Sequence, residues 1–450
     1  MNRRLLACML CLTSAVTAAT GPARADIVFG GPAVYEAAVG VWWTPFFDPS
    51  LPDTEINAQG VQVNNQAKNW SFVRYNAYFE NDAGNIALGK YFSTKTNTID
   101  YQIEQIDDLG FDFVVADLTN GVGEGKQGAI NFITRLETLS TAQGSSIDLE
   151  FAAAMGGPLW KPQYDAYGQL ITGSALNQLV QNEADAVWNE LVMEAGTSIQ
   201  RSSYFEVEDG AGVLRPLMLT YMDYDNQNYL PFPLWYDFRF VIERATGLVS
   251  NDNPNLDFVD NGYNWNAWWG WLSESQVLSP SAMLISPGFD TDHFKGAGAG
   301  VTKDRMDGAV YTDQWLTAIA EDPDFIIVSS WNDYNEETHI EPCEPILSWI
   351  SPITDTPNPP LPFLDINGFQ TSDLYRQHTR AYLALRDNTL IEGFYYTDNN
   401  TPNIYVVDGP DLVLIGALGQ IAPNSAVVTL PVGVLDPILN GAVSTVWLQQ

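Results

Sequence analysis

The feature that most constrains the fold is a repeated order of short apolar, β-rich runs, each followed by a segment with helical periodicity. The first run is residues 38–43, AVGVWW. Residues 99–109 then carry isoleucine and leucine at helical spacing, and Gly110 is typical of a helix end. The next apolar run, residues 111–118, follows at once. Such alternation favours a parallel sheet covered by helices.

The same unit recurs along most of the chain. Further strand-like runs are residues 147–155, 215–224, 282–290 and 325–331, and helical patterns lie near 131–139, 175–195, 313–320 and 374–386. From about residue 388 the pattern changes to short β-like runs between Gly, Pro and Asn turns, without a recurring helix pattern. We therefore expect one large α/β domain over residues 26–387 and a small β-rich module over residues 388–450.

The positions of polar residues decide between an open sheet and a closed barrel. Asp117, Asp223, Asp290 and the Asn332–Asp333 pair all follow the carboxyl ends of predicted strands. In a (β/α)8 barrel this face carries the chemistry, whereas an open sheet gathers such groups at one switch point. No glycine-rich phosphate loop follows any strand. The sequence predicts an α/β fold of the (β/α)8 TIM-barrel type.

The first 25 residues predict the compartment. Arg3 and Arg4 precede an apolar run that ends near the small-residue triplet at 23–25, which is the order of a secretory signal peptide. The leader carries three arginines and no acid, so its removal changes the net charge from −35 to −38. Nucleic acid and anionic membrane surfaces would be repelled, and no later stretch is apolar enough to span a bilayer. We expect a secreted protein, extracellular or periplasmic; the sequence carries no signal for its oligomeric state.

Residues 329–342, SSWNDYNEETHIEP, are the strongest candidate for chemistry. Four carboxylates follow an apolar strand, and burial together with like charge raises a carboxyl pKa. Two unequal acids are what cleavage of a glycosidic bond requires. Asp333 and Glu336, three residues apart, would share one side of a helical turn. The competing interpretation is a solvated acidic turn, since charged residues are mostly exposed.

This stretch resembles a family signature. Residues 331–342 are similar to the motif at the last barrel strand of glycoside hydrolase family 99, the endo-α-mannosidases and endo-α-mannanases, and their Asn-Asp-Tyr portion is closer to family 71, the α-1,3-glucanases. Residues 88–117, 286–290 and 305–331 follow the order of family 99 blocks. The resemblance implies a (β/α)8 glycosidase in which Glu336 is the general acid/base and Asp333 its partner. The sequence departs from family 99 at Asp333, where Glu is usual, and at Glu337, where Gly is usual.

Other residues are candidates for binding substrate. Asn332, Trp331 and Tyr334 are of types that stack on or hydrogen-bond to sugars. Asp117 and Asp223 end strands, where they either hold sugar hydroxyls or cap the following helices. Glu150 lies in a predicted strand and alternatively forms an ion pair, and Asp290 lies on a loop near His293. Tyr311 matches the family pattern. Trp268 and Trp43 either contact sugar or pack in the core.

The residues thus predict a secreted glycoside hydrolase without a cofactor, and the resemblance implies that it cleaves an α-linked polysaccharide, an α-mannan or α-glucan. Asp290, Asp292 and His293 offer metal-type ligands, but contact with sugar is the preferred interpretation, and three histidines exclude a His-rich metal centre. The alternatives are a non-catalytic carbohydrate-binding protein on the same barrel and a surface or adhesive protein.

Overall fold

The structure is a computed structural model. It describes residues 26–45, 47, 54–56, 62–64, 73–156, 163–165, 167–208, 214–222, 239–244, 263–266, 282–291, 293, 302–351, 357, 359–360, 363–364, 370–398 and 403–440. The expected leader, Asp223 and Trp268 lie outside these residues.

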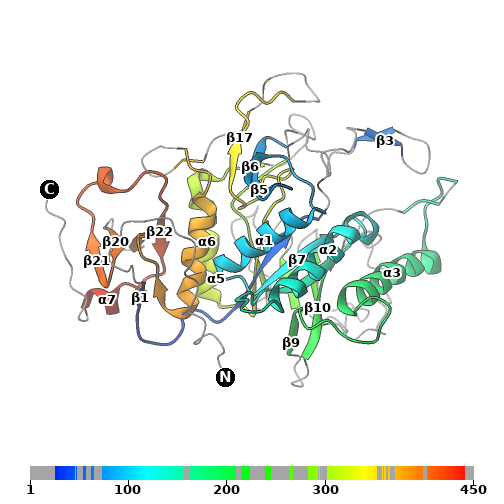
Figure 1. Cartoon of the computed structure of the whole chain (residues 1–450), viewed down its shortest axis with the longest axis horizontal. Helices are drawn as coiled ribbons and strands as arrows, with labels where there is room; N and C mark the ends of the chain where they lie inside the picture. The colour runs from blue at the N-terminus through cyan, green and yellow to red at the C-terminus, as the bar shows by residue number, and fades with distance from the viewer. Residues whose placement is uncertain are drawn as a thin grey trace.

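A sheet of parallel strands forms the centre of the molecule (Figure 1). Its parallel strands, in spatial order, are β11 (Arg239–Arg244), β12 (Tyr263–Asn266), β13 (Ala282–Ile285), β16 (Phe325–Val328), β2 (Ala38–Trp43), β7 (Phe113–Leu118), β8 (Glu150–Met155) and β10 (Leu214–Met222). β10 also pairs in parallel with β11, so each of these strands has two parallel neighbours. β9 (Glu206–Glu208) joins β10 antiparallel. The predicted parallel sheet of an α/β fold is confirmed.

Side chains of the central strands alternate between two hydrophobic clusters. One face carries Trp42, Val115 and Ala152 into a cluster formed largely by the strands themselves. The other face carries Val114 and Phe151 into the cluster that contains the buried helix residues. This is the period of two that a strand imposes. The face with Trp42 therefore points away from the helices.

Aromatic rings fill the inner cluster near the amino ends of the strands. Phe113 stacks on Phe205 with ring centroids 4.1 Å apart, and Phe325 meets Phe113 edge-on at 6.4 Å. Gly40 makes room for this packing, because a Cβ at that position would lie 2.3 Å from the Phe113 ring. Burial of such rings is a main source of stability in a core.

Helices connect and cover the strands. They are α1 (Thr96–Leu109), α2 (Val122–Ser140), α3 (Gly173–Val187) with a π-helical turn (Trp188–Val192), a 3-10 turn (Met306–Gly308), α5 (Ala309–Glu321), and α6 (Leu374–Ala384) with a 3-10 turn (Leu385–Asp387). α1 buries Ile99, Ile103 and Ile106 on one face and ends at Gly110, whose φ of 93° is left-handed. Both features match the sequence prediction.

Smaller sheets lie around the central one. β5 (Tyr75–Glu80) pairs with β6 (Ile86–Gly89) and with β17 (Cys343–Pro345), which follows the candidate loop. Two short pairs are β3 (Thr54–Ile56) with β4 (Gln62–Asn64), and β14 (Phe289–Asp290) with β15 (Thr302–Lys303). β5 thereby connects the end of the candidate loop to the region that precedes α1.

A separate antiparallel and parallel sheet forms in the C-terminal segment and packs on α5 and α6 through β22 (Figure 1). Its strands are β19 (Tyr395–Asp398), β20 (Ile404–Asp408), β21 (Asp411–Leu414) and β22 (Val427–Leu430), with a 3-10 turn (Leu418–Gln420) and α7 (Asp436–Asn440). The segment is β-rich as expected, but α7 is a helix that the turn-rich sequence did not predict.

The beginning of the described chain is tied to the junction before this sheet. β1 (Ile27–Val28) pairs antiparallel with β18 (Thr389–Leu390). The amide of Glu392 donates to the Asp26 carboxylate at 2.8 Å across 366 residues of sequence. The domain boundary at residue 388 remains a prediction, because β1, at the start of the described chain, pairs with β18, which follows that boundary.

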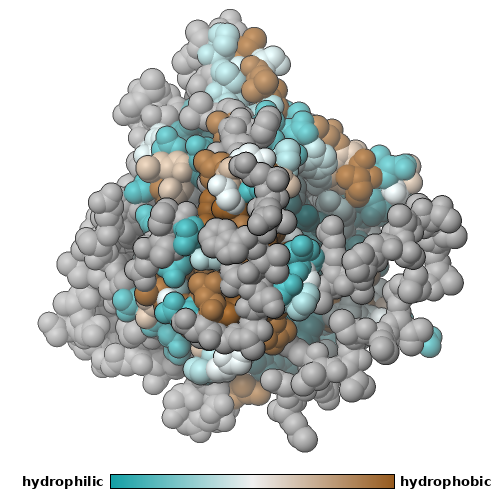
Figure 2. All heavy atoms as spheres, turned by 90° about the vertical axis from the view of Figure 1, so that its left-hand side faces the viewer, coloured by the Kyte–Doolittle hydropathy of each residue, from teal (hydrophilic) through white to brown (hydrophobic). Residues whose placement is uncertain are grey.

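Within the described residues, no helix has the length and apolar character needed to cross a membrane. Figure 2 views the molecule from the side of the C-terminal sheet, and on its coloured part hydrophobic residues lie in small groups among hydrophilic ones. That part of the surface shows no broad apolar face of the kind that marks a large docking site.

Candidate active site

The loop after β16 lies at the carboxyl end of the central sheet. β16 pairs with β2 up to Val328–Val41, and β2 pairs with β7 up to Trp43–Ala116, so the carboxyl ends of the three strands are adjacent. Asp117 and the loop residue Asp333 consequently flank the end of β2. Parallel strands place residues that are distant in sequence on one edge in this way.

Asp333 is buried at the start of the loop turn. Its amide donates to Ser330 Oγ at 2.7 Å, and its carboxylate accepts the amide of Glu336 at 3.0 Å. Burial raises the pKa of the Asp333 carboxyl, the Glu336 amide opposes that rise, and the negative charge of Asp117 adds to it. Asp333 is therefore a carboxyl group that holds its proton to a higher pH than an ordinary aspartate.

Asp117 shares the inward face of β7 with Val115. It is 5% exposed, and its Oδ1 accepts the amide and the hydroxyl of Thr119 at 3.0 and 2.7 Å. The N-cap of α2 is Gly121, so Asp117 does not cap that helix. The expected cap role is therefore wrong, and the expected contact with sugar stays a prediction.

Glu336 and Glu337 occupy the turn after Asp333. Glu336 is half-buried, and its carbonyl accepts the amide of Asp290 at 2.8 Å. Glu337 has a left-handed φ of 54°, which explains why glycine is usual at this position of the resembled motif. A left-handed backbone costs a non-glycine residue about 1 kcal/mol or more. Arg74 offsets this, because Nε and Nη2 bind Glu337 and Asp290 at 2.5 Å each.

Asp290, His293 and Glu337 also form a group whose potential ligand atoms lie within 4.8 Å of one another. The guanidinium of Arg74 already neutralises both carboxylates of this group. The arrangement thus fits an ion-pair cluster that fixes the loop against β14 better than it fits a metal centre. Asp290 belongs to this ion-pair cluster and is linked to the candidate loop by Arg74, which also binds Glu337.

Glu341 closes the loop and is 1% exposed. Its Oε1 accepts Gln102 Nε2 at 2.7 Å and Trp331 Nε1 at 3.1 Å. Its Oε2 accepts the hydroxyls of Tyr91 at 2.9 Å and Tyr334 at 2.7 Å. Burial raises the pKa of Glu341 to about 7, against the effect of these donors. One carboxylate thereby joins α1, the segment before it and both ends of the loop.

The other polar and aromatic residues of the motif are structural in this arrangement. Asn332 Oδ1 accepts the Thr44 amide at 2.7 Å, and its Nδ2 donates to the Thr44 carbonyl at 3.1 Å and to Tyr91 at 3.0 Å. Trp331 and Tyr334 are fully buried and donate to Glu341. We expected these three to contact sugar; the Asn332 amide instead holds the loop at the end of β2, and the polar groups of Trp331 and Tyr334 hold Glu341.

Three further expectations are wrong in position. Trp43 points toward the helices, donates to Gln102 at 2.9 Å and packs on Phe132. Tyr311 lies between α5 and α6, where its hydroxyl bonds to Thr379 at 2.8 Å. Glu150 is the first residue of β8, paired with Phe113. It thus lies five residues, or about 16 Å, from the carboxyl end of that strand, and it has no ion pair among the described residues.

Sequence reasoning missed four residues that shape the site. Trp42, and not Trp43, shares the inward cluster with the strand residues. The register between β2 and β7 determines this face, and no local pattern in the sequence gives that register. Arg74, Tyr91 and Gln102 reach the loop from segments that no local pattern connects to it.

Glu341 predicts a pH-dependent stability. The pKa rises from about 4.5 in the unfolded chain to about 7 in the fold. Between these values the folded protein keeps a proton that the unfolded chain has lost, so this stabilisation is complete below about pH 4.5 and is lost as the pH rises through 7. We expect the difference in unfolding free energy between wild type and Glu341→Gln to fall by about 3 kcal/mol from pH 4.5 to 7.5. Urea unfolding at both pH values measures it, and a constant difference would contradict the shift.

Comparison with known proteins gives one finding. No protein-family profile matches the sequence, and no curated protein matches it. Among solved structures, the chain is similar to the GH99 endo-α-mannosidase from Bacteroides thetaiotaomicron, both alone and in complex with bis-tris-propane. In each case the TM-score is 0.47 at 13% identity, over 79% of this chain and 99% of that one. A likeness this weak assigns neither fold nor activity.

Proposed function

We propose that this protein is a secreted glycoside hydrolase that cleaves an α-linked polysaccharide, an α-mannan or α-glucan. The observation that carries the proposal is the position of Asp333, buried at the carboxyl end of a parallel sheet with a raised pKa beside Asp117. A solvated acidic turn would leave its carboxylates exposed with ordinary pKa values. A carboxylate with a raised pKa is the stronger base once it is ionised, which suits the removal of a proton from an attacking hydroxyl group.

Glu336 is the second carboxyl group in this proposal. It is half-buried in the same turn, three residues after Asp333, and its own amide is fixed by the Asp333 carboxylate. Glu336 would protonate the glycosidic oxygen as the bond to the anomeric carbon breaks. Asp333 would take a proton from the attacking hydroxyl group of a water molecule, whose oxygen forms the new bond at that carbon as the glycosidic bond breaks. Asp117 would hold a sugar hydroxyl or tune Asp333.

The proposed architecture is a closed (β/α)8 barrel. The ring of parallel pairings, including β10 with β11, supports closure, and the inward face of β7 carries Asp117. A barrel of this kind gathers catalytic residues from several strand ends at one mouth. Adjacent ends of β16, β2 and β7 would form part of that mouth.

A carbohydrate-binding protein without catalysis is the main alternative. Such a protein recognises sugar through exposed aromatic faces and hydrogen-bonding groups. Trp331, Tyr334 and Asn332 are buried and occupied within the loop. The loop therefore offers no aromatic platform, and its half-buried acid is Glu336, beside the buried Asp333, which favours chemistry. The mixed surface in Figure 2 gives no support to an adhesive surface protein.

The experiment is a substrate screen with matched variants. Wild type, Glu336→Gln and Glu321→Gln would be incubated with α-mannans and α-glucans, and released reducing ends would be counted. We expect hydrolysis of at least one polysaccharide by wild type and by Glu321→Gln, whose side chain is exposed at the end of α5. Glu336→Gln should be slower by about 10²–10⁴-fold, the usual contribution of a general acid. Equal activity of Glu336→Gln and wild type would remove Glu336 from the mechanism.

A further inference from the structure

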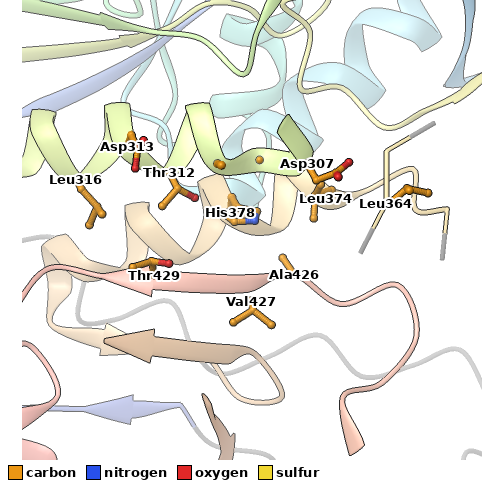
Figure 3. A pocket seen from close by; sticks show the side chains of 12 residues that line it. Asp307, Thr312, Asp313, Leu316, Leu364, Leu374, His378, Ala426, Val427 and Thr429 are labelled. Atoms are coloured by element: carbon orange, nitrogen blue, oxygen red, sulfur yellow. The ribbon is translucent and has the colours of Figure 1, made fainter. Parts of the chain in front are cut away.

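A cavity lies between α5, α6 and the C-terminal sheet, and no residue of the candidate loop lines it (Figure 3). Its volume is about 460 Å³, within the range of small-molecule sites. α5 and the turn before it supply one wall, His378 of α6 the back, and β22 the opposite wall. The pocket thus exists only because the C-terminal sheet packs against the helices.

His378 is the unexplained group of this pocket. It is 4% exposed, and its Nδ1 is buried without a hydrogen-bond partner among the described residues. Its ring lies 6.4 Å from that of Tyr382, and a Cβ placed on Gly308 would lie 3.4 Å from its Nε2. Burial lowers the pKa of His378 to about 4, so the ring is neutral at neutral pH. A buried polar nitrogen without a partner is costly unless something binds it.

The lining determines which ligands fit. Carboxylates of Asp307 and Asp313 are exposed at the rim, and Thr312 and Thr429 add half-buried hydroxyls. Leu316 and Val427 provide apolar surface. Among the described lining residues there is no Lys or Arg, which disfavours an anion. There is also no Trp, Tyr or Phe on which a pyranose ring could stack.

We propose that this pocket binds a small organic cation, a primary ammonium group on a short apolar chain. Its N–H groups would donate to the rim carboxylates, the hydroxyls and the free His378 nitrogen, while the chain covers Leu316 and Val427. Acceptors paired with an ammonium group form charge-assisted hydrogen bonds, which are stronger than neutral ones. The excess of acid in the whole chain, −35, favours the approach of a cation. The site does not depend on the proposed hydrolase activity.

The test is a titration of the full chain with n-butylammonium chloride at about 0.15 M ionic strength, which screens non-specific attraction. n-Butanol is the matched neutral ligand. The chain has three histidines, so the ring ¹⁵N signals can be assigned to His378 with a His378→Gln variant. We expect the amine, and not the alcohol, to bind saturably and to shift the His378 ring signals.

Two variants distinguish binding in the pocket from non-specific attraction of the amine to the acidic chain. Asp313→Asn removes a rim carboxylate, and Glu321→Gln removes one exposed charge from the same helix outside the pocket. Asp313→Asn should weaken amine binding about five-fold or more, the effect of one charge-assisted contact, whereas Glu321→Gln should leave it unchanged. Equal binding of butanol, equal weakening by Glu321→Gln, or saturation without a shift of the His378 signals would each overturn the proposal.

Discussion

Asp333→Asn is expected to retain the fold and to hydrolyse the polysaccharide substrate at least about 10³-fold more slowly than wild type. The amide keeps the shape of the side chain and can still accept the Glu336 amide, which wild-type Asp333 accepts at 3.0 Å. It cannot take a proton from the attacking hydroxyl. Steady-state kcat on the best polysaccharide measures the change. Asp82→Asn is the matched control, because Asp82 is exposed and forms an ion pair with Lys95 at 3.4 Å, away from the candidate loop.

The pH dependence of kcat/KM provides a second test, because a residue with a purely structural role would not shift it. As a base, Asp333 must be ionised, and burial and then Asp117 raise its pKa. In wild type, kcat/KM should therefore rise with pH along a limb that lies above the usual aspartate value of about 4. Asp117→Asn removes a nearby negative charge, so the limb should move to lower pH. A limb that Asp117→Asn leaves in place, or a rate equal to wild type in Asp333→Asn, contradicts the assigned role.

Glu341→Leu is expected to lower the free energy of unfolding by about 4 kcal/mol and to abolish activity. Four donors converge on this carboxylate, and Trp331 and Gln102 can only donate through the nitrogens involved. Leucine fills much of the volume but leaves buried donors unpaired, at roughly 1–3 kcal/mol each where no partner replaces it. Loss of the loop geometry should follow, since Tyr334 and Trp331 flank Asp333 in sequence.

Glu341→Gln is the control for this prediction. Its amide oxygen can still accept from Gln102 and Trp331, and its nitrogen can face the two tyrosine hydroxyls, which rotate. At pH 7.5 we expect it to lose at most about 1–2 kcal/mol. Urea unfolding monitored by tryptophan fluorescence compares the two variants. If Glu341→Leu were as stable as Glu341→Gln, the carboxylate would not be the element that holds the loop.

Several central strands and helices were predictable because local periodicity records them, whereas β11, β12 and α7 were not predicted. Isoleucines at helical spacing and the glycine at 110 defined α1, and the apolar run at 325–328 defined β16. The candidate loop was likewise predictable, since Asp333 follows a buried strand. These features depend on residues a few positions apart, which a sequence displays directly.

Contacts between distant segments were not predictable. Asn332 was expected to face sugar, but its partner Thr44 is 288 residues away. Nothing in the sequence connects Glu341 with Gln102, 239 residues before it. The prediction for Trp43 was wrong for a different reason. Adjacent residues of a strand point to opposite faces, and the composition of the strand does not show which of Trp42 and Trp43 faces inward. The acids could be found, but not the groups that orient them.

The pairing of β1 with β18 also affects how the chain reaches its fold. Contacts between residues separated by up to 366 positions form only after nearly the whole chain has left the ribosome. The first strand must therefore wait, unpaired, while the sheet between its ends assembles, and closing so long a loop is slow. An N-terminal fragment that stops before residue 389 would lack the partner of its first strand.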